Sequence, residues 1–305
     1  MTKVAVCQIL STNDPAHNLA VSSKVIRDAV AAGAKAVFLP EASDFIATSA
    51  QECRDLSFPL SQHPYALGLQ KLAKELGVTV SAGVHDLPEA DEPNHEPEGS
   101  IRVYNTHVLI GADGSLLARY RKLHLFDVEL AQTNEDGTPA KPKRTGESDR
   151  IIPGGEIVPP IPIAGVGNIG LEICYDLRFP ELHIILTRLG ADILTFPSAF
   201  TLRTGKDHWP TLCRAVAIQY QVYVLAAAQY GDHNPSRSSW GESLAFDPWG
   251  RELGRLRSIK EESPDVDRMY AEGGEFFICD VDTGVVGIDQ YGIVGKELPE
   301  PPLKE

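Results

Sequence analysis

Apolar and polar positions follow two different periods over the first forty residues. Residues 3–8 form a short apolar run that predicts a buried strand. Further on, apolar side chains recur on one half of a helix whose other half is mostly polar. Asn13 or Asp14 before Pro15 is typical of a helix start, and Gly33 ends that helix. Residues 36–39 form a second apolar run, so a strand–helix–strand unit is predicted. The apolar half of the helix comprises Leu19, Val21, Val25, Ile26, Ala29 and Val30.

The rest of the chain continues the alternation of apolar runs and amphipathic segments. We predict helices over residues 64–76, 180–189 and 209–219, with Pro210 in the first turn of the last. Strands are predicted at 78–84, 168–174, 192–196, 222–228 and 275–281. Hairpins are predicted around turns at 111–114 and 247–250. This order of elements predicts an α/β fold with mixed sheets and helices outside them.

Two polar stretches separate these elements. Residues 85–100 are acidic and rich in proline, which is typical of a surface loop. Residues 129–156 are polar and show no clear period, so we interpret them as a long functional loop. Neither stretch marks a domain boundary, because composition does not shift along the chain. We therefore expect a single domain over residues 1–305.

Composition places the chain among ordinary globular proteins. It has 305 residues, of which 43% are hydrophobic and 23% charged. The longest apolar stretches, such as 222–228, are far shorter than the roughly 20 residues of a membrane span. The N-terminus lacks the pattern of a secretory signal, so we expect a cytoplasmic protein, with a short organellar signal as the open alternative. The formal net charge of −14 argues against binding to nucleic acid or to anionic membranes. An anionic substrate would need local cations in its site.

Cysteine and histidine usage argues against disulfides and metals. The five cysteines contain no CxxC pair, and their odd number in an unsecreted chain favours free thiols. The nine histidines form no HxH or HExxH pattern, so no metal site is expected. Residues 165–170 match GxGxxG but precede a predicted strand, which is the wrong context for a dinucleotide site. We expect no cofactor.

Three residues are candidates for catalysis, and each also has a structural interpretation. Cys174 lies where a predicted strand passes into a helix, which suits a nucleophile surrounded by backbone N–H groups. A free cysteine in an apolar strand is more often part of the core. Glu41 and Lys122 each follow a predicted strand, although such residues are usually solvated surface charges. Spacing alone does not indicate that the three side chains meet.

The motifs around these residues resemble the three signatures of the nitrilase superfamily of carbon–nitrogen hydrolases. They are Phe-Leu-Pro-Glu at 38–41, Tyr-Arg-Lys-Leu-His-Leu at 120–125 and Cys-Tyr-Asp-Leu-Arg-Phe-Pro-Glu at 174–181. The resemblance implies a four-layer α-β-β-α sandwich with two mixed sheets. It also implies a homodimer formed through the helices beside the nucleophile.

The same resemblance implies a role for each matching residue. Glu41 is the general base, and Cys174 forms a thioester with the substrate. Lys122 and the backbone N–H of Tyr175 stabilise the oxyanion. Glu147, in the segment 146–154, matches a second glutamate that positions the site.

Further segments resemble one branch of the superfamily. Residues 196–200, 204–209, 221–229 and 239–243 are similar to deaminated glutathione amidases and, less closely, to ω-amidases. Both groups hydrolyse amides of α-keto dicarboxylic acids. The chain departs from the branch at Val216, Gln219 and Glu242, and its tail diverges from about Gly284. N-carbamoyl hydrolase, nitrilase and non-catalytic scaffold remain alternative functions, and the complete set of three motif residues argues against the last.

Arg178 is the predicted ligand of the substrate carboxylate. A guanidinium group binds a carboxylate through two parallel hydrogen bonds. The alternative is a structural salt bridge to Asp176 or Glu181. Phe200 and Thr201 are predicted to line the same pocket. If Arg178 is structural, Arg203 or Lys206 would take over the carboxylate.

Overall fold

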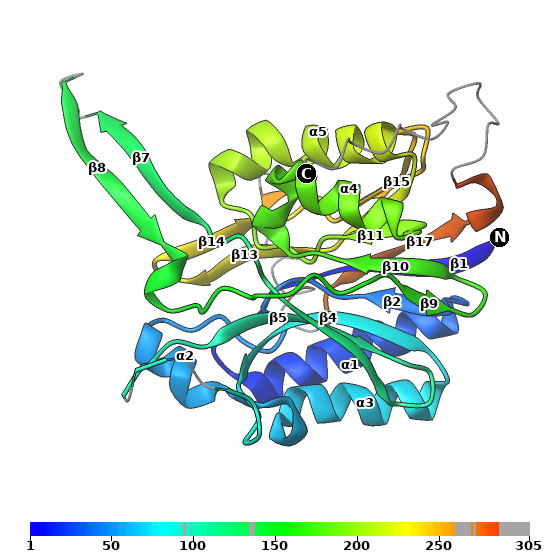
Figure 1. Cartoon of the computed structure of the whole chain (residues 1–305), viewed down its shortest axis with the longest axis horizontal. Helices are drawn as coiled ribbons and strands as arrows, with labels where there is room; N and C mark the ends of the chain where they lie inside the picture. Colours follow the sequence, from blue (N-terminus) through cyan, green and yellow to red (C-terminus); the bar gives the residue numbers. More distant parts are fainter. Residues whose placement is uncertain (94–95, 98, 134–137, 260–269, 271–272, 287–305) are drawn as a thin grey trace, which may run out of the picture.

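Two β-sheets pack face to face between two layers of helices in the computed structural model (Figure 1). Helices α1 (Pro15–Ala31) and α3 (Pro64–Leu76) cover one outer face, and α4 (Pro180–Arg188) and α5 (Leu202–Tyr220) cover the other. The structure describes residues 1–93, 96–97, 99–133, 138–259, 270 and 273–286. The predicted α/β, four-layer α-β-β-α sandwich is confirmed.

The first sheet contains nine strands among the described residues and is mixed. Its order is β14-β13-β1-β2-β4-β5-β6, with β17 also paired to β1 and β3 to β4. Strand β1 is parallel to β2 and β13 but antiparallel to β17. The strands are β1 (Thr2–Ile9), β2 (Ala36–Phe38), β3 (Phe58–Pro59), β4 (Thr79–Leu87), β5 (Tyr104–Ile110), β6 (Leu116–Arg121), β13 (Ala228–Asn234), β14 (Arg237–Trp240) and β17 (Glu275–Val281).

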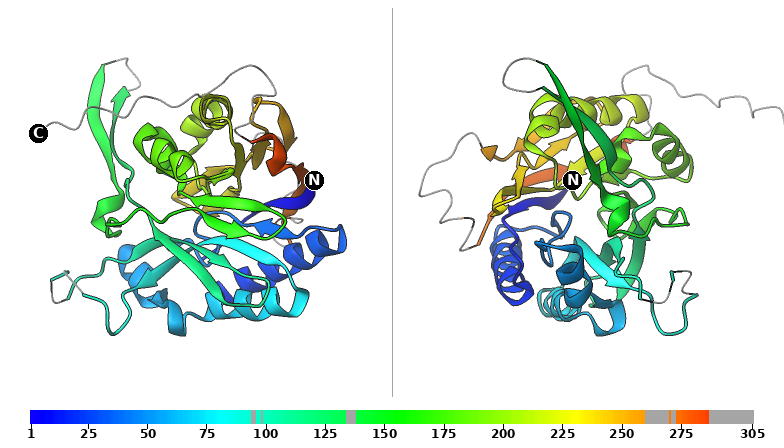
Figure 2. Two further views of the ribbon diagram at one scale, coloured as in Figure 1. Left: turned by 45° about the vertical axis from the view of Figure 1, so that its right-hand side comes forward. Right: turned by 90° about the vertical axis from the view of Figure 1, so that its left-hand side faces the viewer.

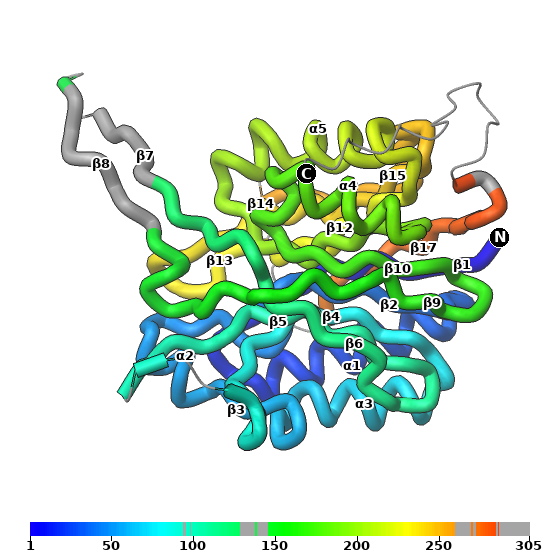
Figure 3. Tube along the Cα trace, in the orientation of Figure 1, coloured from blue at the N-terminus to red at the C-terminus, as the bar shows by residue number. Residues whose placement is uncertain are grey.

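The second sheet contains six strands among the described residues, in the order β16-β15-β12-β11-β10-β9. They are β9 (Ile161–Ile163), β10 (Gly167–Leu171), β11 (Ile193–Thr195), β12 (Tyr223–Ala226), β15 (Leu244–Phe246) and β16 (Glu252–Arg255). Figure 3 traces the chain through both stacked sheets. Short helices connect the strands: α2 (Ala50–Leu56), η1 (Leu60–Gln62), η2 (Glu147–Asp149), η3 (Cys174–Arg178) and η5 (Thr283–Val285). No helix in the described part of the chain is long and apolar enough to span a bilayer.

Helix boundaries with strong local signals match the prediction. Helix α1 begins after Asp14, whose carboxylate accepts hydrogen bonds from the N–H groups of Ala16 (3.0 Å) and His17 (3.1 Å). Helix α3 has both predicted bounds and ends at Gly77, which takes the left-handed conformation with φ 62°. A capping side chain and a C-terminal glycine therefore determine these ends locally.

The predicted start of α5 is wrong by seven residues. The helix begins at Leu202, so Pro210 lies inside it instead of in its first turn. Tertiary contacts hold the extra turns. Gly205 lies so close to Trp240 that an added Cβ would approach its Cβ to 2.2 Å, and the Trp209 indole N–H donates to the Glu242 carbonyl at 2.8 Å. These contacts offset the missing hydrogen bond of the proline.

Two further predictions need correction. The apolar run 222–228 is not one strand. Strand β12 ends at Ala226 in the second sheet, and β13 begins at Ala228 in the first sheet. The predicted long loop 129–156 includes a two-stranded antiparallel ribbon of β7 (Asp127–Thr133) and β8 (Pro139–Gly146). Among the described residues, these two strands pair with each other and with neither sheet. The pairing uses backbone N–H and C=O groups, which a polar sequence provides as well as an apolar one. Of the divergent tail, residues 287–305 lie outside the described residues.

The core between the sheets is continuous and almost entirely apolar. One buried cluster joins Val4, Val6 and Phe38 of the first sheet to Ile169 and Leu171 of the second. A second cluster lies between the first sheet and the α1 and α3 layer. Figure 2 shows the two sheets between their helices from two further directions. Burial of these side chains at roughly 25 cal/mol per Å² is the main force that holds the layers together.

His107 makes a polar link across this apolar core. Its side chain on β5 is fully buried, with Nδ1 3.0 Å from the Glu172 carbonyl of the second sheet and Nε2 2.6 Å from Ser81 Oγ on β4. Since a carbonyl can only accept, Nδ1 donates and Nε2 accepts from the serine hydroxyl. Burial lowers the pKa of His107 to about 4. The neutral ring therefore joins the two sheets at neutral pH.

We predict that His107 contributes to acid instability. Below pH 6.5 the unfolded chain takes up a proton at this position and the folded protein does not, until the pH reaches about 4. The free energy of unfolding should therefore fall by on the order of 3 kcal/mol from this group between those pH values. Denaturant unfolding from pH 7 to 4 measures the slope. His107→Gln should be less stable at pH 7 but show a flatter slope, and parallel curves would contradict the prediction.

Candidate active site

Glu41 stands on a strained turn at the end of β2. The residue after it, Ala42, has φ 54°. This left-handed conformation is energetically unfavourable for any residue that has a side chain. Gln229 holds the turn, because its amide N–H donates to the backbone carbonyls of Glu41 (3.0 Å) and Ala42 (3.2 Å). Gly83 on β4 lies below it, and an added Cβ there would come within 2.5 Å of Glu41 Cα. The close approach requires glycine at this position.

Lys122 follows β6 and is buried between two carboxylates. Its Nζ lies 2.9 Å from Glu41 Oε1 and 3.0 Å from the carboxylate of Glu147 in η2. The Asn105 amide donates to both glutamates, at 2.7 Å to Glu41 and 3.2 Å to Glu147. The backbone of Lys122 also donates to the Asn105 carbonyl at 2.9 Å. Segments far apart in the sequence thus share one buried hydrogen-bond network.

Cys174 is the first residue of η3, between β10 and α4, and it also has a strained backbone, with φ 47°. The Asp176 carboxylate braces this elbow by accepting from the Ile173 N–H at 2.9 Å and from the Tyr120 hydroxyl at 2.8 Å. The thiol is partly exposed, whereas the other four cysteines are buried. The N–H of Tyr175 is one of the N-terminal groups of η3 that have no partner within the helix.

Charge compensation sets the protonation states of these groups. Burial alone would raise the pKa of the Glu41 carboxyl, but Lys122 and Asn105 outweigh burial and lower the pKa. Burial alone would lower the pKa of Lys122, but Glu147 and Glu41 raise it above its ordinary value. Burial and Glu41 raise the pKa of the Cys174 thiol, and Lys122 offsets part of that rise. At neutral pH the site holds a carboxylate, an ammonium group and an un-ionised thiol.

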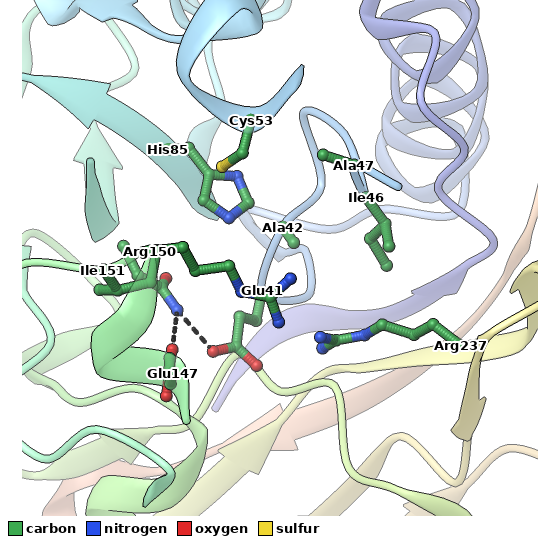
Figure 4. A pocket seen from close by; sticks show the side chains of 11 residues that line it. Glu41, Ala42, Ile46, Ala47, Cys53, His85, Glu147, Arg150, Ile151 and Arg237 are labelled. Carbon is green, nitrogen blue, oxygen red and sulfur yellow. Dashed lines mark hydrogen bonds between the residues drawn. The ribbon is translucent and has the colours of Figure 1, made fainter. Parts of the chain in front are cut away.

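A small cavity of about 40 Å³ adjoins Glu41 (Figure 4). Figure 4 shows the guanidinium groups of Arg150 and Arg237 pointing toward the Glu41 carboxylate. Cys174 and Lys122 are not among the lining residues. The residues that line it are Glu41, Ala42, Ile46, Ala47, Cys53, His85, Asn105, Glu147, Arg150, Ile151 and Arg237. Cations and carboxylates therefore share one concave wall.

Arg178 lies elsewhere. Its Nη2 is 2.9 Å from His208 Nδ1, and its guanidinium carbon is 5.9 Å from the centre of the Tyr175 ring. Within the described part of the chain, Arg178 forms no ion pair with Asp176 or Glu181, whose pairing was the structural alternative. The carboxylate contact stays a prediction.

Phe200 and Thr201 also lie outside the lining of the cavity. Phe200 is buried, with its ring 4.5 Å from that of Trp209. The Thr201 hydroxyl is 2.9 Å from the Thr204 hydroxyl at the start of α5. Their predicted part in a substrate pocket stays a prediction.

Four residues that contribute to this arrangement were missed from the sequence. Asn105 is the first of three consecutive polar residues, 105–107, in a buried strand, which is a usable but weak signal for a buried network. Arg150 lies in the segment 146–154 and Gln229 in the segment 221–229, and both segments resemble the family, but neither residue was predicted to lie near Glu41. Arg237 lies outside every predicted motif. In the part of the chain that the structure describes, no group of three or more histidine, cysteine, aspartate or glutamate side chains could hold a metal ion.

Comparisons with known proteins identify the family and relatives of this chain. The model of the carbon–nitrogen hydrolase family matches residues 3–271. Deaminated glutathione amidase of Bos taurus is 45% identical over 252 residues, which covers 83% of this chain and 72% of that protein.

Two solved structures share the fold. The Caenorhabditis elegans NitFhit protein superposes with a TM-score of 0.76 at 36% identity, covering 93% of this chain. This chain spans only 61% of that fusion protein. Saccharomyces cerevisiae Nit3, described as a member of branch 10 of the nitrilase superfamily, superposes with a TM-score of 0.72 at 26% identity, covering 93% of this chain and 91% of Nit3.

The exposure of the five thiols predicts selective alkylation. Iodoacetamide should modify Cys174 of the native protein first, because Cys174 is partly exposed and the other four cysteines are buried. Peptide mass spectrometry after partial labelling measures the order. Equal labelling of Cys53 and Cys174 would contradict the prediction, and labelling in denaturant is the control that all five thiols can react.

Proposed function

We propose, because the chain belongs to the carbon–nitrogen hydrolase family, that it is a cysteine-dependent amidase acting on the amide of a small α-keto carboxylate. Deaminated glutathione, the substrate in the name of its 45% identical relative, is the substrate we favour. The observation that carries the proposal is the buried Glu41–Lys122–Glu147 network beside the strained Cys174 elbow. This arrangement combines a base, an oxyanion donor and a nucleophile.

The first half-reaction forms a thioester. Glu41 accepts the thiol proton of Cys174 as the sulfur attacks the amide carbon, and the carbonyl oxygen becomes an oxyanion. Lys122 Nζ and the Tyr175 N–H donate hydrogen bonds to that oxygen. Glu41 then transfers its proton to the amide nitrogen, the carbon–nitrogen bond breaks, and the amine leaves.

Water completes the second half-reaction. Glu41 takes a proton from water as the hydroxyl oxygen attacks the thioester carbon. The carbon–sulfur bond breaks, the acid is released, and the thiolate of Cys174 regains the proton from Glu41. Glu147 and Asn105 stay in place, where they hold Lys122 and Glu41 in register. Lys122 lowers the pKa of Glu41, so this carboxyl group is ionised and ready to act as a base at neutral pH.

A substrate panel tests the proposal. We expect kcat/KM to be highest for deaminated glutathione, lower for α-ketoglutaramate, and negligible for glutathione, simple nitriles and N-carbamoyl compounds. Cysteinylglycine release by mass spectrometry identifies the reaction. Highest activity on α-ketoglutaramate would indicate an ω-amidase, carbon dioxide release an N-carbamoyl hydrolase, and no turnover of any compound a scaffold.

Variants of the network supply the controls for that panel. Cys174→Ser should abolish turnover, and Lys122→Ala should lower kcat by about 10²-fold, which is the scale for the loss of one oxyanion donor. Glu41→Gln should be at least as damaging, because both half-reactions use the base. Cys279→Ala is the matched cysteine control and should keep most activity, since Cys279 is buried on β17.

We also propose that two copies of the chain associate through α4 and α5. Ile184 and Ile185 on α4 and Ile218 on α5 are each more than a third exposed, and Leu189 just after α4 is 56% exposed. Light scattering should give twice the 33.2 kDa of one chain. Ile185→Asp should produce monomers, whereas Leu117→Asp on β6 should leave the dimer intact. A monomeric wild-type protein would refute the proposal.

The free cysteines are also relevant to the cellular location of the protein. We infer a cytoplasmic location, because the five cysteines are free in the structure, as is usual in a reducing compartment. Fractionation of the source cells is the measurement, and recovery from an oxidising compartment would contradict it.

A further inference from the structure

Arg150 and Arg237 form a pair of cations with no carboxylate partner of their own. Arg150 follows η2, and Arg237 is the first residue of β14. Both line the cavity beside Glu41. Figure 4 shows that their side chains approach Glu41 with the guanidinium groups foremost. Within the described residues, neither side chain forms an ion pair or a side-chain hydrogen bond. In a chain of net charge −14, two such arginines side by side are unusual.

The two charges oppose one another. Burial lowers the pKa of Arg150, and the positive charge of Arg237 lowers it further. Elsewhere arginines pair with carboxylates, as Arg27 does with Glu75, Arg121 with Asp86 and Arg257 with Glu275. Two guanidinium groups at one partly buried cavity are stable only with an anion nearby. Glu41 and Glu147 supply a part of that negative charge, but they are already held by Lys122 and Asn105.

The position of the cavity indicates which part of a substrate reaches it. In the proposed mechanism Glu41 passes a proton to the nitrogen of the leaving amine, so the leaving group must lie on the Glu41 side of the scissile bond. Glu41 and Glu147 line the cavity, whereas Cys174, which keeps the acyl group, does not. In the proposed mechanism the arginine pair therefore lies on the leaving-group side of the scissile bond.

We propose that Arg150 and Arg237 bind the terminal carboxylate of a peptide-like leaving group, and so select amides whose released amine carries a carboxylate. The inference rests on the proposed amidase function and deepens it. Two planar forks facing one site can clamp a carboxylate through parallel hydrogen bonds. A cavity of about 40 Å³ suits a carboxylate group and not a whole dipeptide.

This assignment separates two carboxylates of deaminated glutathione. One belongs to the α-keto acid and remains with the acyl group, and the other terminates the cysteinylglycine that leaves. Arg178, four residues after Cys174 and outside the cavity, is the predicted ligand of the first. Arg150 and Arg237 bind the second. An ω-amidase substrate such as α-ketoglutaramate releases ammonia, which has no carboxylate to occupy the second site.

Three substrates and two variants test the inference. The substrates are deaminated glutathione, the same compound with its C-terminal carboxylate converted to a carboxamide, and α-ketoglutaramate. Arg150→Lys and Arg237→Lys keep the positive charge, which preserves the effect of Arg237 on the pKa of Glu41 but removes the fork. Each variant should lower kcat/KM for deaminated glutathione about tenfold, and change the value for the other two substrates less than about threefold.

Other patterns would overturn the inference. An equal loss on all three substrates would mean that the arginines support the fold or the base, and no loss on any would mean that they do not touch the leaving group. Arg178→Lys is the matched comparison: all three substrates keep the α-keto acid carboxylate, so this variant should lower kcat/KM for all three. If Arg178→Lys alone distinguished deaminated glutathione from its carboxamide, the leaving-group site would be at Arg178. Thermal melting checks that each variant is folded.

A measurement on the wild-type protein makes the test independent of the variants. Cysteinylglycine should inhibit competitively at a concentration about tenfold lower than its C-terminal amide. Equal inhibition by both would overturn the inference. If wild type hydrolyses none of the three substrates, the proposed function fails; if it hydrolyses them without preference for the free carboxylate, only the arginine assignment fails.

Discussion

The burial of the Lys122 ammonium between the carboxylates of Glu41 and Glu147 is the interaction on which the rest of the site depends. A charge in this position is tolerable only because both carboxylates lie within about 3 Å of it and Asn105 ties them together. Removal of one partner from such a network typically costs about 3–5 kcal/mol, since the remaining charges stay buried. The same attraction keeps Glu41 ionised beside a neutral thiol. One electrostatic constraint therefore joins the end of β2, the end of β6 and η2, and also lowers the pKa of Glu41.

Backbone strain is the second element of the design, and packing opposes it. Ala42, the residue after Glu41, and Cys174 both take left-handed conformations. The surrounding hydrogen bonds come from fully buried side chains, Gln229 for the first turn and Asp176 for the second. Gln229 lies on β13 and Asp176 in η3, and their hydrogen bonds stabilise the two strained turns. Packing thus fixes the backbone at Glu41 and at Cys174.

The net negative charge of the chain makes arginines near the site important for binding an anionic substrate. A protein of net charge −14 repels anions at long range, so recognition of a carboxylate must come from cations close to the reacting atoms. In the proposed mechanism Arg178, four residues after Cys174 in the sequence, binds the carboxylate of the acyl group, and the Arg150 and Arg237 pair beside Glu41 binds the carboxylate of the leaving group. Such an arrangement would select substrates that carry two carboxylates at a fixed separation. A peptide-like amide has both carboxylates, whereas a simple amide lacks the second.

Local signals were sufficient for most elements and for the residues of the three motifs. Asp14, Pro64 and Gly77 act on the backbone within a few residues, so the starts of α1 and α3 and the end of α3 follow from the sequence. The motifs around Glu41, Lys122 and Cys174 are equally local. The start of α5, the break between β12 and β13, and the roles of Asn105, Gln229, Arg150 and Arg237 needed the folded chain. Gln229 braces Glu41 across 188 residues, and no periodicity encodes a contact between side chains that only the packing of two sheets brings together.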